Sequence, residues 1–322
     1  MNARLFAYFL LLITSVIWGF AGPILKYSFA YISPFEFLFW RFLLACVVTL
    51  PIMFWYFKKH PLKTHDYVRL FILGLLCTTI NLSLLLVGLS KTTVIEATLI
   101  GSLTPLLVVV FSSFFLHEKI SRRMRLGLGL ALLGSTLTIF QPLLQGRAFS
   151  NFSGNLLLVL GGFAWVGFVL LSKKWEHPDL KPFHIVSFSF FVVLLSFFLI
   201  TLFTQSISFS LYSIPKPVIL PLIYMAVFSS LIAYTAYEVA VSKINASQAD
   251  PFGYLAAVWS IPLAIIWLGE KFDFTLLASS LLILVGIIIA EYKKGLLNSP
   301  HRVRGPVSTR QSLGGHHLAH HK

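Results

Sequence analysis

Two stretches of the sequence share residues and spacing: Leu89-Ser90-Lys91 precedes His117-Glu118-Lys119-Ile120, and Val241-Ser242-Lys243 precedes Gly269-Glu270-Lys271-Phe272. In both stretches the second lysine follows the first by 28 residues, and the two copies lie 152 residues apart. At the same offset Thr93 aligns with Asn245, and Glu96 with Gln248, which is the spacing of a helix-capping box. The chain is therefore a duplicated unit.

The duplicated unit has the composition of a membrane protein. Hydrophobic residues make up 57% of the 322 residues and charged residues 11%, a balance typical of chains that lie in a bilayer. Two related halves of a helical membrane bundle are typical of secondary transporters, which bind their substrate between the halves near the midplane.

Apolar runs of about 20 residues predict helices that cross the hydrocarbon core. The runs are continuous rather than alternating, which excludes sheet and barrel folds. We therefore expect an all-α integral membrane protein with ten transmembrane helices, at residues 5–25, 34–57, 70–90, 97–116, 126–146, 148–172, 183–204, 217–237, 251–269 and 274–290.

Five helices in each copy require the second copy to enter the membrane upside down relative to the first. The sequence thus predicts two inverted five-helix repeats, residues 5–146 and 148–292, followed by a basic cytoplasmic tail, 293–322. The tail is rich in Arg, Ser, Gly and His, and we interpret it as disordered; weak metal binding by its histidines is the alternative.

The distribution of Lys and Arg predicts the orientation. Segments on the side of the N-terminus carry most of the 25 basic residues, whereas the opposite helix ends carry few, so both termini are expected in the cytoplasm. The same bias accounts for the net charge of +14 without a nucleic-acid partner. The few basic residues on the opposite side are Lys26, Lys91, Arg147, Lys216 and Lys271.

The region from Leu5 to Glu291 resembles an EamA-type member of the drug/metabolite transporter superfamily. The residues that carry the resemblance are Trp18-Gly19, Ser33-Pro34 leading to Arg41, the turn at Ser90 to Thr93, Leu103-Thr104-Pro105 and the two Glu-Lys pairs. The resemblance implies transport of amino acids, related metabolites or drugs, often as export from a bacterial cell across its inner membrane. The second copy departs from the pattern, because Ala256-Ala257 stands at the position of Pro105.

Arg41 is the deepest charged residue of the predicted spans. A charge at membrane depth costs about 2.5–3.5 kcal/mol on insertion scales and therefore usually faces a cavity or a partner. Arg41 is a candidate to bind a substrate carboxylate; a tie between helices or snorkelling toward the outer surface are the alternatives.

Three acidic residues are candidates for ion coupling: Glu238, Asp250 and Glu96. Glu238 and Asp250 lie near the cytoplasmic ends of consecutive helices and align with Leu86 and Thr98 of the first copy. Two carboxylates brought close in a poorly solvated site favour protonation of one of them, which suits proton coupling. The alternatives are interfacial solvation of Glu238, capping by Asp250 of a helix that starts at Pro251, and the capping-box role of Glu96.

Several aromatic residues within the spans are candidates to line a pathway for organic substrates. We select Trp18, Tyr254 and Tyr237; small neighbours such as Gly19 and Gly253 are expected to leave room around Trp18 and Tyr254. Packing or interfacial placement is the common role of such residues.

These observations predict an alternating-access permease for a small organic metabolite, embedded in the lipid bilayer, without a cofactor or a bound metal. A lipid-handling or non-transporting protein on the same fold is the first alternative. An intramembrane enzyme is the second, although Ser, Cys, His and Asp do not recur in a recognised catalytic arrangement.

Overall fold

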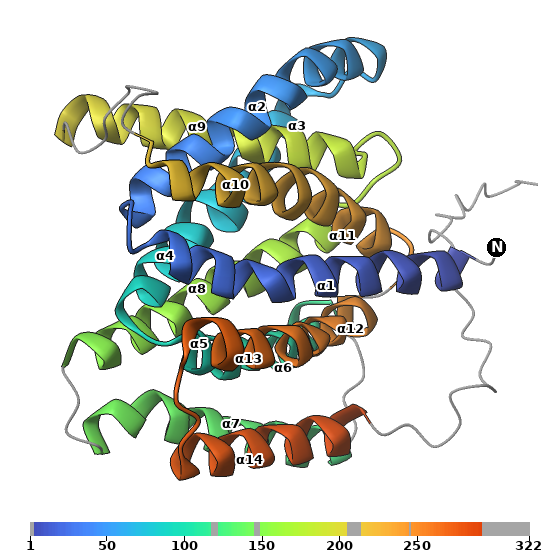
Figure 1. The fold of residues 1–322 in the computed structure, drawn as a ribbon. Coiled ribbons are helices and arrows are strands. Elements are labelled where there is room, and N and C mark those ends of the chain that lie inside the picture. The colour runs from blue at the N-terminus through green and yellow to red at the C-terminus, as the bar shows by residue number, and fades with distance from the viewer. Residues whose placement is uncertain (1–2, 117–121, 145–148, 205–213, 245, 292–322) are drawn as a thin grey trace, which may run out of the picture.

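The structure is a computed structural model that describes residues 3–116, 122–144, 149–204, 214–244 and 246–291. Within these residues the secondary structure is helical and contains no strand. Figure 1 shows α1 crossing the middle of the molecule, with α2, α9 and α10 on one side of it and α5, α13, α7 and α14 on the other. The prediction of an all-α fold is confirmed for the described residues.

The helices of the first copy follow one another with short connections. Their bounds are α1 Ala3–Ser28, α2 Pro34–Lys59, α3 Thr64–Gly74, η1 Leu75–Ile80, α4 Asn81–Lys91, α5 Val94–Gly101, α6 Leu103–Phe115 and α7 Arg122–Leu144. The second copy contains α8 Phe149–Lys174, α9 Pro182–Thr204, α10 Lys216–Tyr224, η3 Met225–Ile232, α11 Ala233–Val241, α12 Ala246–Ala249, η4 Asp250–Gly253, α13 Tyr254–Leu268 and α14 Phe274–Glu291.

Seven of the described helical segments are long and apolar enough to cross a bilayer. They are Ala3–Ser28, Pro34–Lys59, Thr64–Lys91, Val94–Phe115, Asn151–Lys174, Pro182–Ile200 and Lys216–Val241. Three shorter apolar helices, Arg125–Gln141, Tyr254–Leu268 and Phe274–Ile289, lie where further spans are predicted. The chain is thus a multi-pass membrane protein.

Local chemistry sets several helix ends. Ser33 accepts the backbone N–H of Glu36 at the start of α2, where Pro34 occupies the first helical position. Thr93 caps α5 in the same way, by accepting the N–H of Glu96. The left-handed conformation of Gly269, at φ 66°, ends α13.

Four helical segments are interrupted, and the interruptions occupy related positions in the two copies. The π-helical turns η1 and η3 follow α3 and α10, and such turns are frequent at functional sites. The segment from Val94 is divided at Ser102 between α5 and α6, and the segment from Ala246 changes to the 3-10 turn η4 at Asp250 before α13 begins.

Several predicted helix starts differ from the structure by a few residues, and two of them lie at acidic residues. The fourth predicted span starts at Ala97, but the helix starts at Val94, since Thr93 caps it and the buried Glu96 lies inside its first turn. The ninth predicted span starts at Pro251, but helical structure is already present from Ala246. A predicted span that admits no charged residue begins after Glu96 or Asp250, whereas both residues lie within helical structure.

Close backbone approaches hold the bundle together. A Cβ atom placed on Gly286 of α14 would lie 2.5 Å from the carbonyl oxygen of Gly127 in α7. A Cβ atom on Gly88 of α4 would lie 2.8 Å from the carbonyl oxygen of Gly154 in α8. Small residues at such contacts allow two membrane helices to pack at short distance.

Candidate functional site

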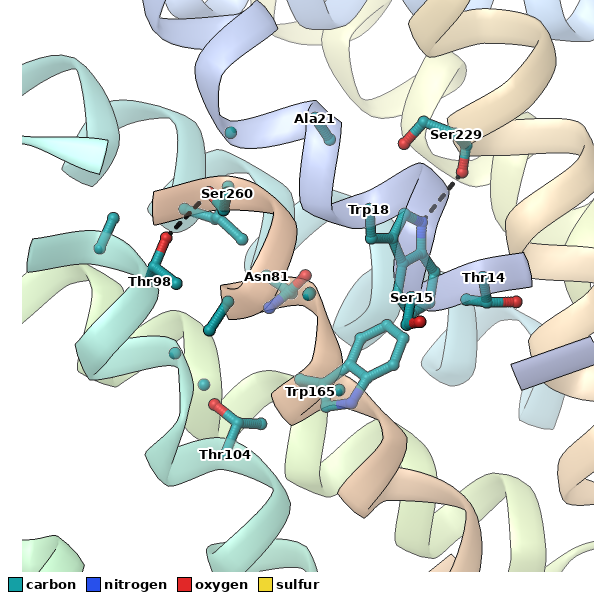
Figure 2. A pocket seen from close by; sticks show the side chains of 18 of the residues that line it. Thr14, Ser15, Trp18, Ala21, Asn81, Thr98, Thr104, Trp165, Ser229 and Ser260 are labelled. Carbon is teal, nitrogen blue, oxygen red and sulfur yellow. Dashed lines mark hydrogen bonds between the residues drawn. The ribbon is translucent and has the colours of Figure 1, made fainter. Parts of the chain in front are cut away.

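A cavity of about 310 Å³ lies at the centre of the bundle. We call it the central cavity. Its walls come from both copies: α1, α2, α4, α5 and α6 from the first, and α8, η3, α11, η4 and α13 from the second. Figure 2 shows Trp18, Trp165, Asn81, Thr98 and Ser260 around it. Apolar walls with a few polar groups are typical of pockets for small organic molecules.

Arg41 of α2 lines the central cavity and is only 2% exposed. Its Nε donates to Ser230 Oγ at 2.9 Å, and its Nη2 donates to Ser229 Oγ at 3.3 Å. These hydroxyls belong to the π-helical turn η3. Among the described residues no carboxylate forms an ion pair with Arg41, so the guanidinium keeps donors and an uncompensated positive charge for an anionic group.

Four aromatic rings form a cluster on the same cavity: Trp18, Trp165, Tyr234 and Tyr237. The Trp18 ring centroid lies 5.6 Å from that of Trp165 and 5.3 Å from that of Tyr234, and Trp165 lies 5.2 Å from Tyr237. The indole N–H of Trp18 donates to the carbonyl of Ser229 at 3.2 Å (Figure 2). The aromatic cluster offers ring faces that attract apolar and cationic groups.

Asp250 is a buried acid on the cavity, with 5% of its surface exposed. Tyr237 donates its hydroxyl to Asp250 Oδ1 at 2.7 Å, and the Trp165 Nε1–H donates to the same oxygen at 3.4 Å. The 3-10 turn η4 holds Asp250 at the point where the helix is interrupted. The cavity therefore carries a cation on α2 and an acid on η4.

Several polar residues of the cavity lie outside the sequence-based selection. Thr98 and Ser260 hydroxyls are 3.1 Å apart, and Asn81 donates its amide N–H to the Gly161 carbonyl at 2.8 Å. Ser229 and Ser230 hold Arg41. Asn81 carries the one amide side chain of the predicted span 70–90, and that signal identifies it; Ser and Thr residues are too frequent in membrane helices to stand out.

Of the residues selected from sequence, Arg41, Trp18, Tyr237 and Asp250 line the central cavity. Tyr254 is not among the residues that line it, although its neighbours Gly253 and Ala256 are. Tyr254 packs against the small cluster of Leu106 and Ala131.

The room expected beside Gly19 is also absent. A Cβ atom on Gly19 would lie 2.7 Å from Cβ of Trp259 and 2.9 Å from the Ala256 carbonyl. Gly19 therefore permits α1 and α13 to approach closely and leaves no space there for a substrate.

Glu96 lies away from the central cavity in a buried polar network. Its carboxylate is 2.7 Å from Thr92 Oγ1 and accepts the Asn155 amide N–H at 2.9 Å, and the residue is fully buried. The network joins α5 to α8. With Thr93 accepting its backbone N–H, Glu96 fits the helix-start role that the sequence offers as its alternative.

Glu270, of the second Glu-Lys pair, contacts a helix start. Its two carboxylate oxygens accept the N–H groups of Val94 and Ile95 at 2.7 and 2.9 Å, at the start of α5. Beside it Lys26 donates to the carbonyls of Leu89, Ser90 and Thr92 at the end of α4. The negative charge of Glu270 lies at the positive N-terminal end of α5, and the positive charge of Lys26 lies at the negative C-terminal end of α4, so both placements are favourable. Glu118, Asn245 and the tail 293–322 lie outside the described residues.

Glu238 does not share a cavity with Asp250. It lines a separate pocket beside the connection between α8 and α9, which we call the α8–α9 pocket. Ser172 Oγ donates to Glu238 Oε2 at 3.2 Å, and the residue is 3% exposed. Interfacial solvation of Glu238 is therefore wrong. The two acids, adjacent in the sequence-based prediction, belong to different pockets.

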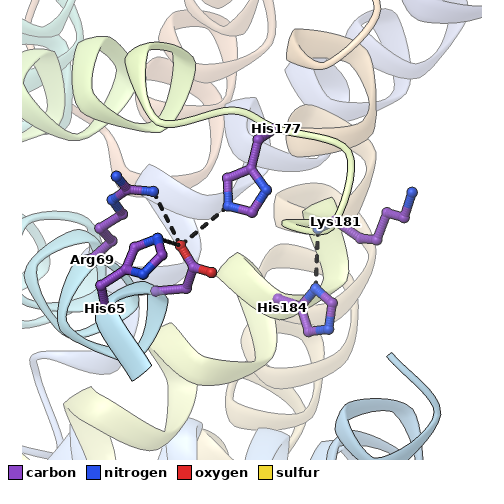
Figure 3. Close-up of polar contacts among 6 residues, drawn as sticks. His65, Arg69, His177, Lys181 and His184 are labelled. Carbon is purple, nitrogen blue, oxygen red and sulfur yellow. Dashed lines mark hydrogen bonds and ion pairs between the residues drawn. The ribbon is translucent and has the colours of Figure 1, made fainter. Parts of the chain in front are cut away.

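A polar cluster joins the start of α3 to this connection. Asp66 Oδ1 lies 3.1 Å from Arg69 Nη1, from His65 Nε2 and from His177 Nε2. Figure 3 shows the side chains of His65, Arg69 and His177 turned toward one another. Nearby, His184 Nδ1 accepts the backbone N–H of Lys181, and its Nε2 contacts the His60 carbonyl at 3.2 Å. The cluster ties the ends of α2, α3, α8 and α9 together.

The sequence model of the EamA-like transporter family matches this chain twice, at residues 5–140 and 152–292. The chain belongs to the EamA-like transporter family. Both matched regions contribute walls to the central cavity.

Relatives of this EamA-like protein are named as transporters. The transporter YyaM of Bacillus subtilis is 27% identical over 288 residues, which cover 88% of this chain and 92% of that protein. A Salmonella typhimurium protein named "Probable amino-acid metabolite efflux pump" is 25% identical over 56% of this chain and 62% of its own length. A crystal structure with 18% identity matches 90% of this chain with a TM-score of 0.63 and supports the fold alone.

Proposed function

We propose that this protein is an alternating-access permease that exports small organic metabolites bearing a carboxylate, such as amino acids and related compounds. The observation that carries the proposal is Arg41, a buried guanidinium on the central cavity without a carboxylate partner among the described residues. A buried charge without its counter-charge is costly. A substrate carboxylate supplies that charge, and the name of the Salmonella relative points to the same substrate class.

Matched helix contacts support two inverted repeats of five helices as the transporting unit. α4 packs on α8 as α11 packs on α1, and α6 packs on α8 as α13 packs on α1. α2 packs on α9, and α7 on α14, so these pairs lie across the axis between the repeats. In the two repeats, 5–146 and 148–292, the shorter helices α7, α13 and α14 complete the ten crossings.

Charge supports an orientation with both termini in the cytoplasm of a bacterial cell. The loops on the side of the N-terminus are rich in Lys and Arg, as expected of cytoplasmic loops. In this orientation the α8–α9 pocket and the Asp66 cluster face the cytoplasm, and the contacts of Glu270 and Lys26 face outward. The central cavity lies between them, as alternating access requires.

Asp250 supplies the second charge of the proposed site. A substrate ammonium group fits beside its carboxylate and the ring faces of Trp165 and Tyr237, which favour cations. When substrate leaves, a proton can take the place of the ammonium group. Alternation of the two cations at one carboxylate would couple export to proton entry.

Transport by the purified protein in liposomes tests the proposal. A panel of labelled amino acids and other carboxylic acids is assayed with and without a pH gradient, against empty liposomes. Arg41→Ala should lower the rate about tenfold to a hundredfold, because hydrogen bonds to charged groups contribute about 1.5–3 kcal/mol and about 1.4 kcal/mol is a factor of ten.

Two further variants make the test specific. Arg41→Lys should retain part of the rate, since it keeps the charge and loses the forked donor geometry. Arg125→Ala removes an exposed guanidinium of α7 and should transport as the native protein does. The proposal fails if no member of the panel moves faster than in empty liposomes, or if Arg41→Ala and Arg125→Ala transport equally well.

A further inference from the structure

The α8–α9 pocket is a second hollow with an acid in its wall. Its volume is about 660 Å³, and it is lined by the end of α8, the α8–α9 connection, the start of α9 and the end of α11. Glu238 comes from α11, and Ser172 comes from α8. Because neither Tyr237 nor Asp250 lines this pocket, it is a site apart from the central cavity.

The carboxyl group of Glu238 accepts fewer hydrogen bonds than a buried carboxylate anion requires. Oε2 accepts one neutral donor, the hydroxyl of Ser172, at 3.2 Å. Oε1 is buried and has no hydrogen-bond partner among the described residues. Burial without donors penalises the ionised form of a carboxyl group far more than the neutral one. The geometry therefore calls for a cation on Oε1.

Two cationic groups on the pocket, Lys173 and His177, have partners elsewhere. Lys173 Nζ lies 2.6 Å from Glu176 Oε2 and donates to the Val241 carbonyl at 3.0 Å. His177 contacts Asp66 at 3.1 Å. None of these groups forms an ion pair with Glu238 in the described part of the chain.

The remaining neighbours do not neutralise Glu238 either. Glu176 adds a like charge, and Lys173, which is bonded to Glu176, adds an opposite one. From α9, Ile185 lines the pocket, and His184 bonds the Lys181 N–H and the His60 carbonyl. α1 and α12 also pack on α11, but none of their described residues lines the pocket.

A proton fits this site better than a metal ion does. Alkali and alkaline-earth ions require several oxygen ligands, whereas here the Val241 carbonyl and the Glu176 carboxylate are engaged by Lys173. The ammonium groups of Lys173 and Lys181 on the pocket wall also repel a metal cation. A proton needs only a lone pair of Oε1.

We propose that Glu238 is a proton-binding site reached through the α8–α9 pocket, and that its protonation holds α8 against α11 in the arrangement seen here. The proton passes from pocket water to Oε1 and forms an O–H bond, which leaves a neutral carboxyl group. Its release restores the negative charge, and water must then enter between Ser172 and Glu238 to solvate it. Release therefore favours separation of α8 from α11 on this side.

The position of Glu238 on α11 connects this site to the central cavity. Tyr237, the preceding residue, turns its hydroxyl to Asp250, while Glu238 faces the α8–α9 pocket; successive residues of an α-helix point about 100° apart. Because both residues lie on α11, a movement of this helix at the α8–α9 pocket also displaces Tyr237 at the central cavity. This use of the proton in transport rests on the proposed function, but proton binding itself does not.

Labelling with dicyclohexylcarbodiimide tests proton binding on the native protein. The reagent reacts with protonated carboxyl groups in apolar surroundings, and peptide mass spectrometry locates the adduct. From about pH 5 to about pH 9, which covers documented titrations of buried carboxyl groups, Glu238 should be labelled at low pH and progressively less as pH rises. Glu176, ion-paired with Lys173, is the internal control. Labelling of Glu238 no greater than that of Glu176 at every pH would overturn the proposal.

Access to the pocket tests the effect on α8 and α11. In a background with Cys46 and Cys77 replaced, Ser242→Cys places a thiol on the pocket wall. Its reaction with a membrane-impermeant maleimide should rise more steeply with pH when Glu238 is native than in Glu238→Gln, a variant of the same shape that does not ionise. Identical pH curves would overturn the proposed opening.

The two experiments separate this inference from the proposed function, because neither requires a substrate. If Glu238 is labelled and opens the pocket but no solute moves, the proton site stands and the permease proposal fails. If solute moves and Glu238 is never labelled, the permease proposal stands and the proton site fails. Size-exclusion chromatography of Glu238→Gln checks that the variant folds.

Discussion

Asp250 and Glu238 are both buried acids of the second copy, yet their surroundings differ. Asp250 accepts two donors, from Tyr237 at 2.7 Å and Trp165 at 3.4 Å, and lies on the central cavity. Glu238 accepts only Ser172, at 3.2 Å, and keeps one oxygen unsatisfied among the described residues. The hydrogen bonds from Tyr237 and Trp165 stabilise the ionised carboxylate of Asp250, which can attract a cation. Glu238 lacks them and is better suited to hold a proton.

The largest expected effect separates the two acids by function. Asp250→Asn should abolish the response of transport to a pH gradient and lower the rate by tenfold or more, because the cavity loses the negative charge for ammonium or proton. Glu238→Gln, the matched change in the other pocket, should still transport and should respond less to cytoplasmic pH. Transport assays of both variants across pH check this contrast, which fails if they behave alike.

A second test removes one hydrogen bond to Asp250 and leaves Glu238 unchanged. Tyr237→Phe removes the hydroxyl that stabilises the ionised carboxylate, so Asp250 should hold its proton to higher pH. Hydrogen bonds to charged groups contribute about 1.5–3 kcal/mol, and about 1.4 kcal/mol corresponds to one pH unit. The midpoint of the pH–transport curve should therefore rise by about one unit or more.

Tyr234→Phe is the control for that change. Tyr234 lies on the same helix and the same cavity, but the hydroxyl that reaches Asp250 belongs to Tyr237. Equal shifts of the midpoint in both variants would contradict the role assigned to Tyr237.

The smallest expected effect concerns Glu238. Ser172→Ala removes the neutral hydroxyl that contacts Oε2, a contact worth about 0.5–1.5 kcal/mol. Carbodiimide labelling of Glu238 should therefore persist to higher pH, by about one unit or less. Ser242→Ala removes a pocket hydroxyl that donates to the Val239 carbonyl instead, and should leave the labelling curve in place.

The sequence predicted much of the fold and part of the site. The apolar runs and the duplication led to the helices, and membrane depth identified Arg41 as a functional candidate. The start of α5 was misplaced because a span without charged residues can begin only after Glu96, whereas Thr93 caps the helix three residues before Glu96. The room expected beside Gly19 was misjudged, because Gly19 serves helix contact and packs on Trp259.

The sequence by itself determined the membrane environment, the helical class and the internal duplication. Composition, run length and residue spacing along the chain are local properties that need no knowledge of packing. Only the tertiary structure decided that Arg41 bonds Ser229 and Ser230, and that Asp250 and Glu238 lie in separate pockets. Those outcomes depend on the faces by which packed helices meet, and the direction of a side chain in a bundle is fixed by neighbours that are distant in sequence.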